Sequence, residues 1–217
     1  MKINDNIEIT NENNLDLMKR YSDKYFDLAI VDPPYGIGIS KNPVRQMHKK
    51  KDWDNEIPSK QYFDELFRVS KNQIIWGGNY FDLPPSQGFY IWDKKQPENF
   101  SLAMCEYAWS SIQKPAKIWS LSVMKEQNKI HPTQKPIELY EWLIMRNAEK
   151  GYKILDTHLG SGSIAIAIDI INKREKLNLQ FIGCELDTDY YNKAMKELRV
   201  KLLHNIYSNE NRLYYWD

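Results

Sequence analysis

The chain has 217 residues, a formal net charge of +1, and 42% hydrophobic, 27% charged and 13% aromatic residues. This length fits one compact domain with a single core and excludes two full domains. The aromatic and apolar content excludes a disordered chain. A net charge so close to zero weighs against a nucleic-acid binder with a strong basic excess, so any such contact has to come from local basic segments.

The two cysteines, Cys105 and Cys184, lie far apart and have no CxxC or CxxxH spacing. They predict neither a metal site nor a disulfide framework, and they are typical of a reducing compartment. Residues 1–10 alternate polar and apolar side chains, and no apolar run approaches the ~20 residues of a membrane-spanning helix. We expect a soluble cytoplasmic protein with no signal peptide, no metal and no membrane partner.

Short strands are predicted for the first part of the chain. Residues 25–31 form an apolar run that stops at Asp32, because the prolines that follow cannot continue a central strand. The other strand candidates are apolar runs followed by polar loops, at residues 73–76, 89–93, 106–111 and 117–120.

From Pro136 onward, helices and strands alternate. A helix with apolar residues at helical spacing begins behind that proline and runs to about Lys150. It is followed by a strand over residues 153–156, a Gly-rich turn that enters a helix over residues 160–171, a strand over residues 180–184 and a final helix over residues 187–203. This alternation predicts parallel strand–helix–strand units.

Asp32-Pro33-Pro34-Tyr35 stands at the carboxyl end of the first predicted strand, where open α/β sheets bind their ligands. An exocyclic amino group of a nucleobase is a poor nucleophile, because its lone pair is delocalised into the ring. A carboxylate at Asp32 and a neighbouring backbone carbonyl can each accept one amino hydrogen, which localises the lone pair on nitrogen. Pro33 and Pro34 add no competing N–H, and Tyr35 offers a flat face for an extruded base. The alternative is a plain strand end with a Pro-Pro turn.

A Gly-rich segment, Asp156-Thr157-His158-Leu159-Gly160-Ser161-Gly162-Ser163, follows a predicted strand and opens a helix. Gly160 and Gly162 permit a ligand to approach the backbone closely, and the helix amino terminus favours a negatively charged group. Glu185 ends the next predicted strand, where an acidic side chain can bind ribose hydroxyls. Because no Walker lysine follows the glycines, an adenosine without phosphates is favoured over a triphosphate. The alternative is a tight turn with Glu185 in solvent.

A third segment, His131-Pro132-Thr133-Gln134-Lys135-Pro136, precedes the predicted helix after Pro136. Thr133 and the free backbone N–H groups of a helix start can hold a carboxylate, and Lys135 adds positive charge. A capped helix start with an exposed Lys135 and a structural His131 explains the same residues equally well.

The three segments together resemble the DNA amino-methyltransferases, the N6-adenine and N4-cytosine enzymes of restriction-modification and orphan systems. Their order resembles the permuted beta-class arrangement, in which the catalytic motif precedes the donor-binding one, and the resemblance extends from about residue 27 to about residue 196. It implies an α/β, Rossmann-like fold with a mostly parallel seven-stranded sheet, an antiparallel edge strand and helices on both faces. The implied methyl donor is S-adenosylmethionine.

The resemblance also implies a role for each matching residue. Asp32, Pro33, Pro34 and Tyr35 are the implied catalytic residues, and the implied donor-binding residues are His131, Thr133, Lys135, Asp156, His158, Gly160, Ser161, Gly162 and Glu185. The chain departs from the family at Thr157 and His158, where proline and phenylalanine are usual, and we expect His158 to make donor affinity pH-dependent.

Aspartate as the first catalytic residue is typical of adenine enzymes, so the resemblance favours N6 of adenine in double-stranded DNA, with the target base flipped out. The alternatives are N4 of cytosine, an RNA base, a protein amide, or a catalytically weak DNA-binding relative. Asp32 in place of asparagine lowers the protein-amide alternative.

Two basic segments are candidate DNA contacts. The first comprises Lys41, Arg45, Lys49, Lys50 and Lys51, and the second is the Lys94-Lys95 pair. A solvated surface loop explains both equally well. We expect a single domain over residues 1–217 with a small inserted DNA-recognition region within about 36–72 and 93–130. An enzyme this small needs a second copy to surround a duplex, so a homodimer is a further expectation.

Overall fold

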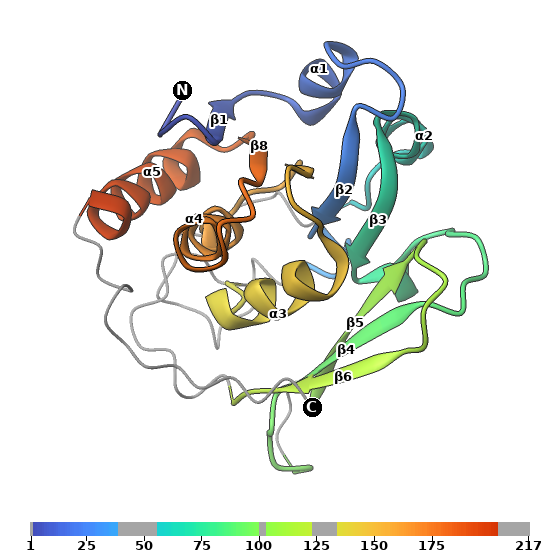
Figure 1. The fold of residues 1–217 in the computed structure, drawn as a ribbon. Coiled ribbons are helices and arrows are strands. Elements are labelled where there is room, and N and C mark those ends of the chain that lie inside the picture. The colour runs from blue at the N-terminus through green and yellow to red at the C-terminus, as the bar shows by residue number, and fades with distance from the viewer. Residues whose placement is uncertain (1, 39–55, 100–102, 123–133, 204–217) are drawn as a thin grey trace.

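The computed structural model describes residues 2–38, 56–99, 103–122 and 134–203, and the fold is given for these residues (Figure 1). Strands and helices alternate along most of the chain. Their bounds are β1 (Ile7–Asn11), α1 (Asn14–Lys19), β2 (Phe26–Val31), α2 (Lys60–Val69), β3 (Ser70–Trp76), the 3-10 turn η3 (Gly78–Tyr80), β4 (Phe89–Asp93), β5 (Cys105–Ser110), β6 (Lys117–Ser120), α3 (Ile137–Asn147), β7 (Lys153–Asp156), α4 (Ser163–Glu175), β8 (Gln180–Glu185) and α5 (Thr188–Leu203).

A single sheet of eight strands carries the fold, in the order β1-β8-β7-β2-β3-β5-β4-β6. All seven predicted strands are present, and β1 is the eighth. It pairs in parallel with β8 at one edge, with Ile7 and Ile9 buried and Glu8 exposed. Its residues alternate between buried and exposed, whereas the strands recognised from the sequence were predicted from apolar runs. The α/β, mostly parallel fold class is confirmed, and the strand number is corrected to eight.

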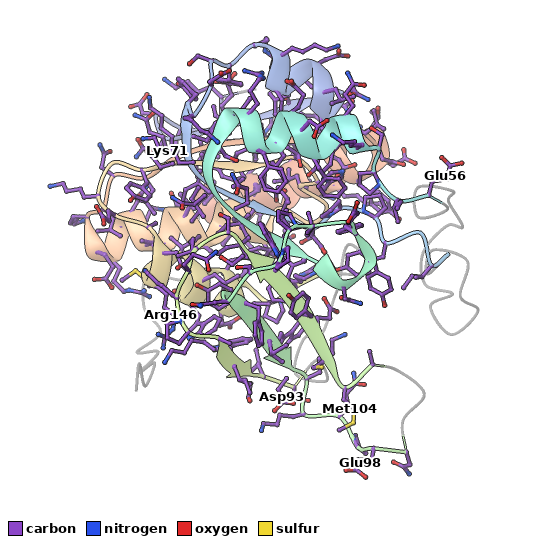
Figure 2. The ribbon with its side chains drawn as sticks, turned by 90° about the vertical axis from the view of Figure 1, so that its right-hand side faces the viewer. Glu56, Lys71, Asp93, Glu98, Met104 and Arg146 are labelled. Carbon is purple, nitrogen blue, oxygen red and sulfur yellow. The ribbon has the colours of Figure 1, made fainter. Side chains whose placement is uncertain are left out.

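The antiparallel strand is β5, and it lies inside the sheet rather than at its edge. It pairs antiparallel with both β3 and β4, whereas β4 pairs in parallel with β6. The chain turns back after β4, so β5 occupies the place between β3 and β4 and leaves the edge to β6. Figure 2 shows the far end of this turn, near Asp93, Glu98 and Met104, extending away from the helical layers.

Helices cover both faces of the sheet because successive strand side chains point to opposite sides. On β3, Ile74 and Trp76 pack into the layer of α3, α4 and α5, whereas Ile75 packs into the layer of α1 and α2. Figure 1 shows these two helix groups on opposite sides of the strands. Two hydrophobic cores therefore hold the sheet between them.

Helix α2, which was not predicted from the sequence, is the crossover between the parallel strands β2 and β3. Its N-cap is Ser59, whose side chain accepts a hydrogen bond from the backbone N–H of Tyr62. Its buried side chains recur at helical spacing, at Tyr62, Phe63, Leu66 and Val69. Residues 60–72 thus form α2 and the start of β3.

The parallel strands β2, β3, β7 and β8 end at the same edge of the sheet, where Asp32, Gly77, Asp156 and Glu185 follow or close them. This is the edge at which open α/β sheets bind their ligands. Among the described helices, none combines the length and apolar character needed to cross a membrane.

Candidate active site

Asp32 directly follows β2, whose apolar residues are buried in the two cores. The Tyr35 hydroxyl donates a hydrogen bond of 2.6 Å to Asp32 Oδ1, and the Lys135 ammonium donates one to Asp32 Oδ2. Burial raises the pKa of Asp32, and the adjacent Lys135 charge opposes that rise. Burial also raises the pKa of Tyr35 well above its ordinary value, so this hydroxyl remains a donor. Pro33 is buried, and Pro34 is partly buried.

The Tyr35 ring lies between other aromatic rings and the backbone. Its face stacks on Tyr80 with centroids 5.1 Å apart and planes 13° from parallel, and Phe81 approaches at 6.3 Å. Gly77 lies directly beneath the ring, at a φ of +68°. A Cβ at Gly77 would lie 2.2 Å from Tyr35 Cε1, so only glycine permits this approach.

We expect Gly77→Ala to destabilise the protein more than Gly151→Ala does. Both glycines have positive φ, which costs an alanine roughly 1–3 kcal/mol. No atom lies within 4 Å of a Cβ at Gly151, whereas the Cβ at Gly77 would displace Tyr35. Urea denaturation of both variants isolates the steric part, and equal losses would contradict the close packing of Gly77 against Tyr35.

Behind Asp32 lies a buried cluster of charges. Lys135 is 2% exposed, and its Nζ lies 3.1 Å from Glu106 Oε2 as well as beside Asp32. The other Glu106 oxygen, Oε1, lies 2.6 Å from Lys94 Nζ. Burial alone would raise the pKa of Glu106, but the two ammonium groups lower it to about 2. The Lys135 charge also lies 5.0 Å from the centroid of the Trp76 ring.

This cluster changes the interpretation of two lysines. Lys94 is 8% exposed and paired with Glu106, so it belongs to the buried cluster and does not present its charge to a DNA phosphate. The turn after β4 places it beside β5, which its sequence position does not reveal. Lys135 is buried rather than exposed, and it contacts Asp32. Lys95 is exposed and lies 2.8 Å from Asp93, so its DNA contact stays a prediction.

The Gly-rich turn between β7 and α4 forms the second part of the site. Gly160 and Gly162 have positive φ, +53° and +77°, and α4 begins immediately afterwards. Ser161 and Ser163 share a hydrogen bond of 2.9 Å between their hydroxyls. The backbone N–H of Gly160 donates 2.9 Å to Glu185 Oε2, which joins the ends of β7 and β8.

Two carboxyls in this part carry raised pKa values. Asp156 is 2% exposed and accepts a hydrogen bond of 2.9 Å from the backbone N–H of His158, and burial raises its pKa to about 8. Burial also raises the pKa of Glu185, whose second oxygen accepts from the backbone N–H of Asp187 at 2.9 Å. Both side chains are thus oriented by backbone donors.

Thr157 and His158, where the chain departs from the family, belong to one hydrogen-bond chain. The Tyr62 hydroxyl lies 2.7 Å from Thr157 Oγ1, which lies 3.0 Å from His158 Nδ1, and His158 Nε2 lies 3.1 Å from Asn14 Nδ2. Because the Asn14 amide nitrogen can only donate, Nε2 accepts and Nδ1 carries the proton. Burial lowers the pKa of His158 to about 3, so its ring is neutral near pH 7. The expected pH-dependent donor affinity therefore does not arise from this residue.

The chain is similar to known DNA methyltransferases. A family model described as DNA methylase, of the N6/N4 type, matches residues 90–196. The type II methyltransferase M2.MboI of Moraxella bovis is 26% identical over 93% of this chain and 89% of its own length. M.BglII of Bacillus subtilis is 21% identical over 88% of this chain and 68% of its own length. The chain belongs to the DNA amino-methyltransferase family of the N6-adenine/N4-cytosine type.

Two solved structures have the same fold. The M1.HpyAVI–SAM complex has a TM-score of 0.56 and 19% identity over 88% of this chain and 98% of that one. The PvuII methyltransferase, titled cytosine-N4-specific, has a TM-score of 0.60 and 12% identity over 94% of each chain.

In this DNA amino-methyltransferase the structure brings together most of the predicted site. Asp32, Tyr35 and Lys135 are hydrogen-bonded neighbours, and Gly160 contacts Glu185. Seven predicted residues lie outside the described residues and stay predictions: His131, Thr133, Lys41, Arg45, Lys49, Lys50 and Lys51.

Glu106, Tyr80, Tyr62 and Asn14 were not predicted from the sequence. Of these, Glu106 had a recognisable signal, as the one acidic side chain in the strand Cys105–Ser110. A charged residue inside an otherwise uncharged strand requires a partner when the strand is buried.

Proposed function

We propose that this protein transfers a methyl group from S-adenosylmethionine to N6 of adenine in double-stranded DNA, with the target base flipped out of the helix. The observation that carries the proposal is the Asp32 carboxylate at the end of β2, held by Tyr35 and Lys135 at the ligand-binding edge of the sheet. The donor supplies an electrophilic methyl group. The permuted, beta-class order of the two motifs is part of the same proposal.

The chemistry of the acceptor side follows from hydrogen bonding. A carboxylate has about four acceptor positions, so Asp32 can accept an amino hydrogen while Tyr35 remains bound to it. A second amino hydrogen goes to the backbone carbonyl beside Asp32, at Pro33. With both hydrogens directed at acceptors, the nitrogen lone pair is localised and available to the methyl group. Pro33 and Pro34 have no N–H that would compete.

The donor side has the features that an adenosine derivative needs. Gly160 and Gly162 leave room for close approach, and Glu185 is held by two backbone N–H groups in an orientation suited to ribose hydroxyls. The neutral His158 ring and Asp156 lie in the same turn. We propose Asp156, His158, Gly160, Ser161, Gly162 and Glu185 as donor-binding residues, together with His131 and Thr133.

We expect Glu185→Ala to weaken donor affinity by ~1–3 kcal/mol, the usual cost of losing a charged hydrogen-bond partner. Calorimetric titration with S-adenosylmethionine measures this as roughly a 5- to 150-fold rise in Kd. Glu197→Ala is the matched control, because Glu197 pairs with Lys201 on α5 at 2.7 Å and takes no part in the site. Unchanged affinity in Glu185→Ala would remove Glu185 from the donor site.

The choice of adenine depends on Asp32, since aspartate in this position is typical of adenine enzymes. N4 of cytosine is the second candidate, and the structural likeness to a cytosine-N4-specific enzyme favours it. For DNA contact we propose the basic residues of segment 41–51 together with Lys95, within a small inserted recognition region of the single domain. We also propose that two copies are needed to surround the duplex.

Expression in a host free of DNA methylation, followed by single-molecule sequencing of its genome, tests the proposal. N6-methyladenine at a recurring sequence is the expected result, and N4-methylcytosine would establish the second candidate instead. A folded protein that binds the donor but leaves every base unmodified, in the genome and in purified DNA, would overturn the proposal.

A further inference from the structure

Lys135 lies between two carboxylates that come from distant parts of the chain. It precedes α3, yet it reaches Asp32 after β2 and Glu106 on β5. With Lys94, the cluster contains two ammonium groups and two carboxylates, so its formal charge is zero. Neutrality of this kind is what makes buried ions tolerable, because a lone buried charge costs several kcal/mol.

The two contacts of Lys135 differ in kind. Its hydrogen bond is directed at Asp32, whereas Glu106 Oε2 lies 3.1 Å away without the alignment of a hydrogen bond. No described residue donates a hydrogen bond to that oxygen, and it is buried. Glu106 therefore has an acceptor position that Lys135 can take with little movement.

Glu106 itself is fixed in place. Its other oxygen is held by Lys94 at 2.6 Å, and the register of β5 against β4 sets Glu106 opposite Trp92. Because β5 lies inside the sheet, between β3 and β4, the Glu106 carboxylate reaches Lys135.

We propose that Glu106 is a positioning residue. It holds the Lys135 ammonium beside Asp32, and its Oε2 accepts the hydrogen bond of that ammonium when the amino group of the base binds Asp32. The inference rests on the proposed function. Without the base, Lys135 and Tyr35 occupy both oxygens of Asp32. When an amino hydrogen arrives, Lys135 moves toward Glu106 Oε2, which leaves Asp32 Oδ2 to the amino hydrogen while the positive charge stays within the cluster.

The test is Glu106→Gln, which keeps the shape of the side chain and removes its charge. With no anion to receive it, Lys135 stays on Asp32 and competes with the base. We expect kcat to fall about 10- to 100-fold, the scale of a misplaced reacting group. The Kd for S-adenosylmethionine and the KM for DNA should stay within about twofold, and Glu106→Asp should recover part of kcat.

Glu141→Gln is the matched control. Glu141 is a buried carboxylate on α3, and it is paired with Arg174 at 2.9 Å. It should lose stability but keep kcat. Methylation by the wild type and by Glu141→Gln tests the proposed function, whatever the result for Glu106→Gln. The proposed function and the positioning role of Glu106 can therefore fail separately.

A double-mutant cycle with Lys135→Met completes the test. If Glu106 acts through Lys135, Glu106→Gln should have little further effect on kcat in the Lys135→Met background. Additive losses, an unchanged kcat in Glu106→Gln, or a Lys135→Met variant that loses donor affinity instead of kcat would overturn the proposal. Should Glu106→Gln fail to fold, Lys94→Met with Glu106→Met removes a neutral pair and should show the same loss of kcat.

Discussion

Replacing Asp32 with alanine should reduce methyl transfer at least ~1000-fold while leaving donor affinity within about threefold. Loss of one preorganised hydrogen-bonding group in a catalytic site commonly costs 10²–10³ in rate, and here the lost group is the main acceptor of the amino hydrogens. Donor affinity should persist because Glu185 and the Gly-rich turn are held by their own backbone contacts. Methylation of DNA with labelled donor and calorimetric donor binding are the two measurements.

The control for this variant lies in β2, the strand that Asp32 follows. Asp27, in β2, pairs with Lys71 at 2.7 Å and accepts from the backbone N–H of Lys153 at 2.9 Å. Asp27→Ala should keep turnover although it also removes an ion-paired carboxylate. Asp32→Ala leaves Lys135 with Glu106 alone, so its stability has to be measured too, and Asp32→Asn provides a second, isosteric variant. Full turnover in a folded Asp32 variant would refute the mechanism.

Asp156→Asn should stabilise the protein at neutral and alkaline pH and reduce the pH dependence of its unfolding. Burial raises the pKa of Asp156 to about 8 in the folded state, against 3.8 for an ordinary aspartate. Below pH 3.8 the carboxyl is protonated in both states and does not change the free energy of unfolding. Between pH 3.8 and 8 the unfolded state ionises while the folded state keeps its proton, so stability falls as pH rises.

The slope for a single such group is at most about 1.4 kcal/mol per pH unit. Urea denaturation at pH 5 to 9 should show the advantage of Asp156→Asn over wild type growing up to about pH 8 and then levelling. Asp27→Asn is the opposite control: burial raises the pKa of Asp27, but Lys71 and the backbone N–H of Lys153 together lower it below its ordinary value. It should lose a constant amount of stability over this range. A constant difference for Asp156→Asn would mean that Asp156 ionises normally.

Much of the fold was predictable because its signals are local. The seven predicted strands and the helices after Pro136 are apolar runs with clear periods and clear stops, and all of them occur. β1 was missed because its residues alternate between buried and exposed and do not form an apolar run, and the helix α1 because six residues make less than two turns. Helix α2 was missed because a long polar segment precedes it.

The positions of Asp32, Asp156 and Glu185 were also predictable, because each stands where an apolar strand ends and parallel strands end at one edge. The partners of Lys135 were not. Its two carboxylates, Asp32 and Glu106, lie 103 and 29 positions away, and no periodicity connects them.

The sequence by itself therefore determined the order of strands and helices, the family and the motif residues at the strand ends, since these depend on neighbours along the chain. Only the tertiary structure decided that β5 lies inside the sheet, that Lys94 and Lys135 are buried, and that Glu106 lies between them. The physical reason is that strand order and ion pairing depend on which distant segments pack together, and a lysine has the same local signature whether its charge ends in water or against a buried carboxylate.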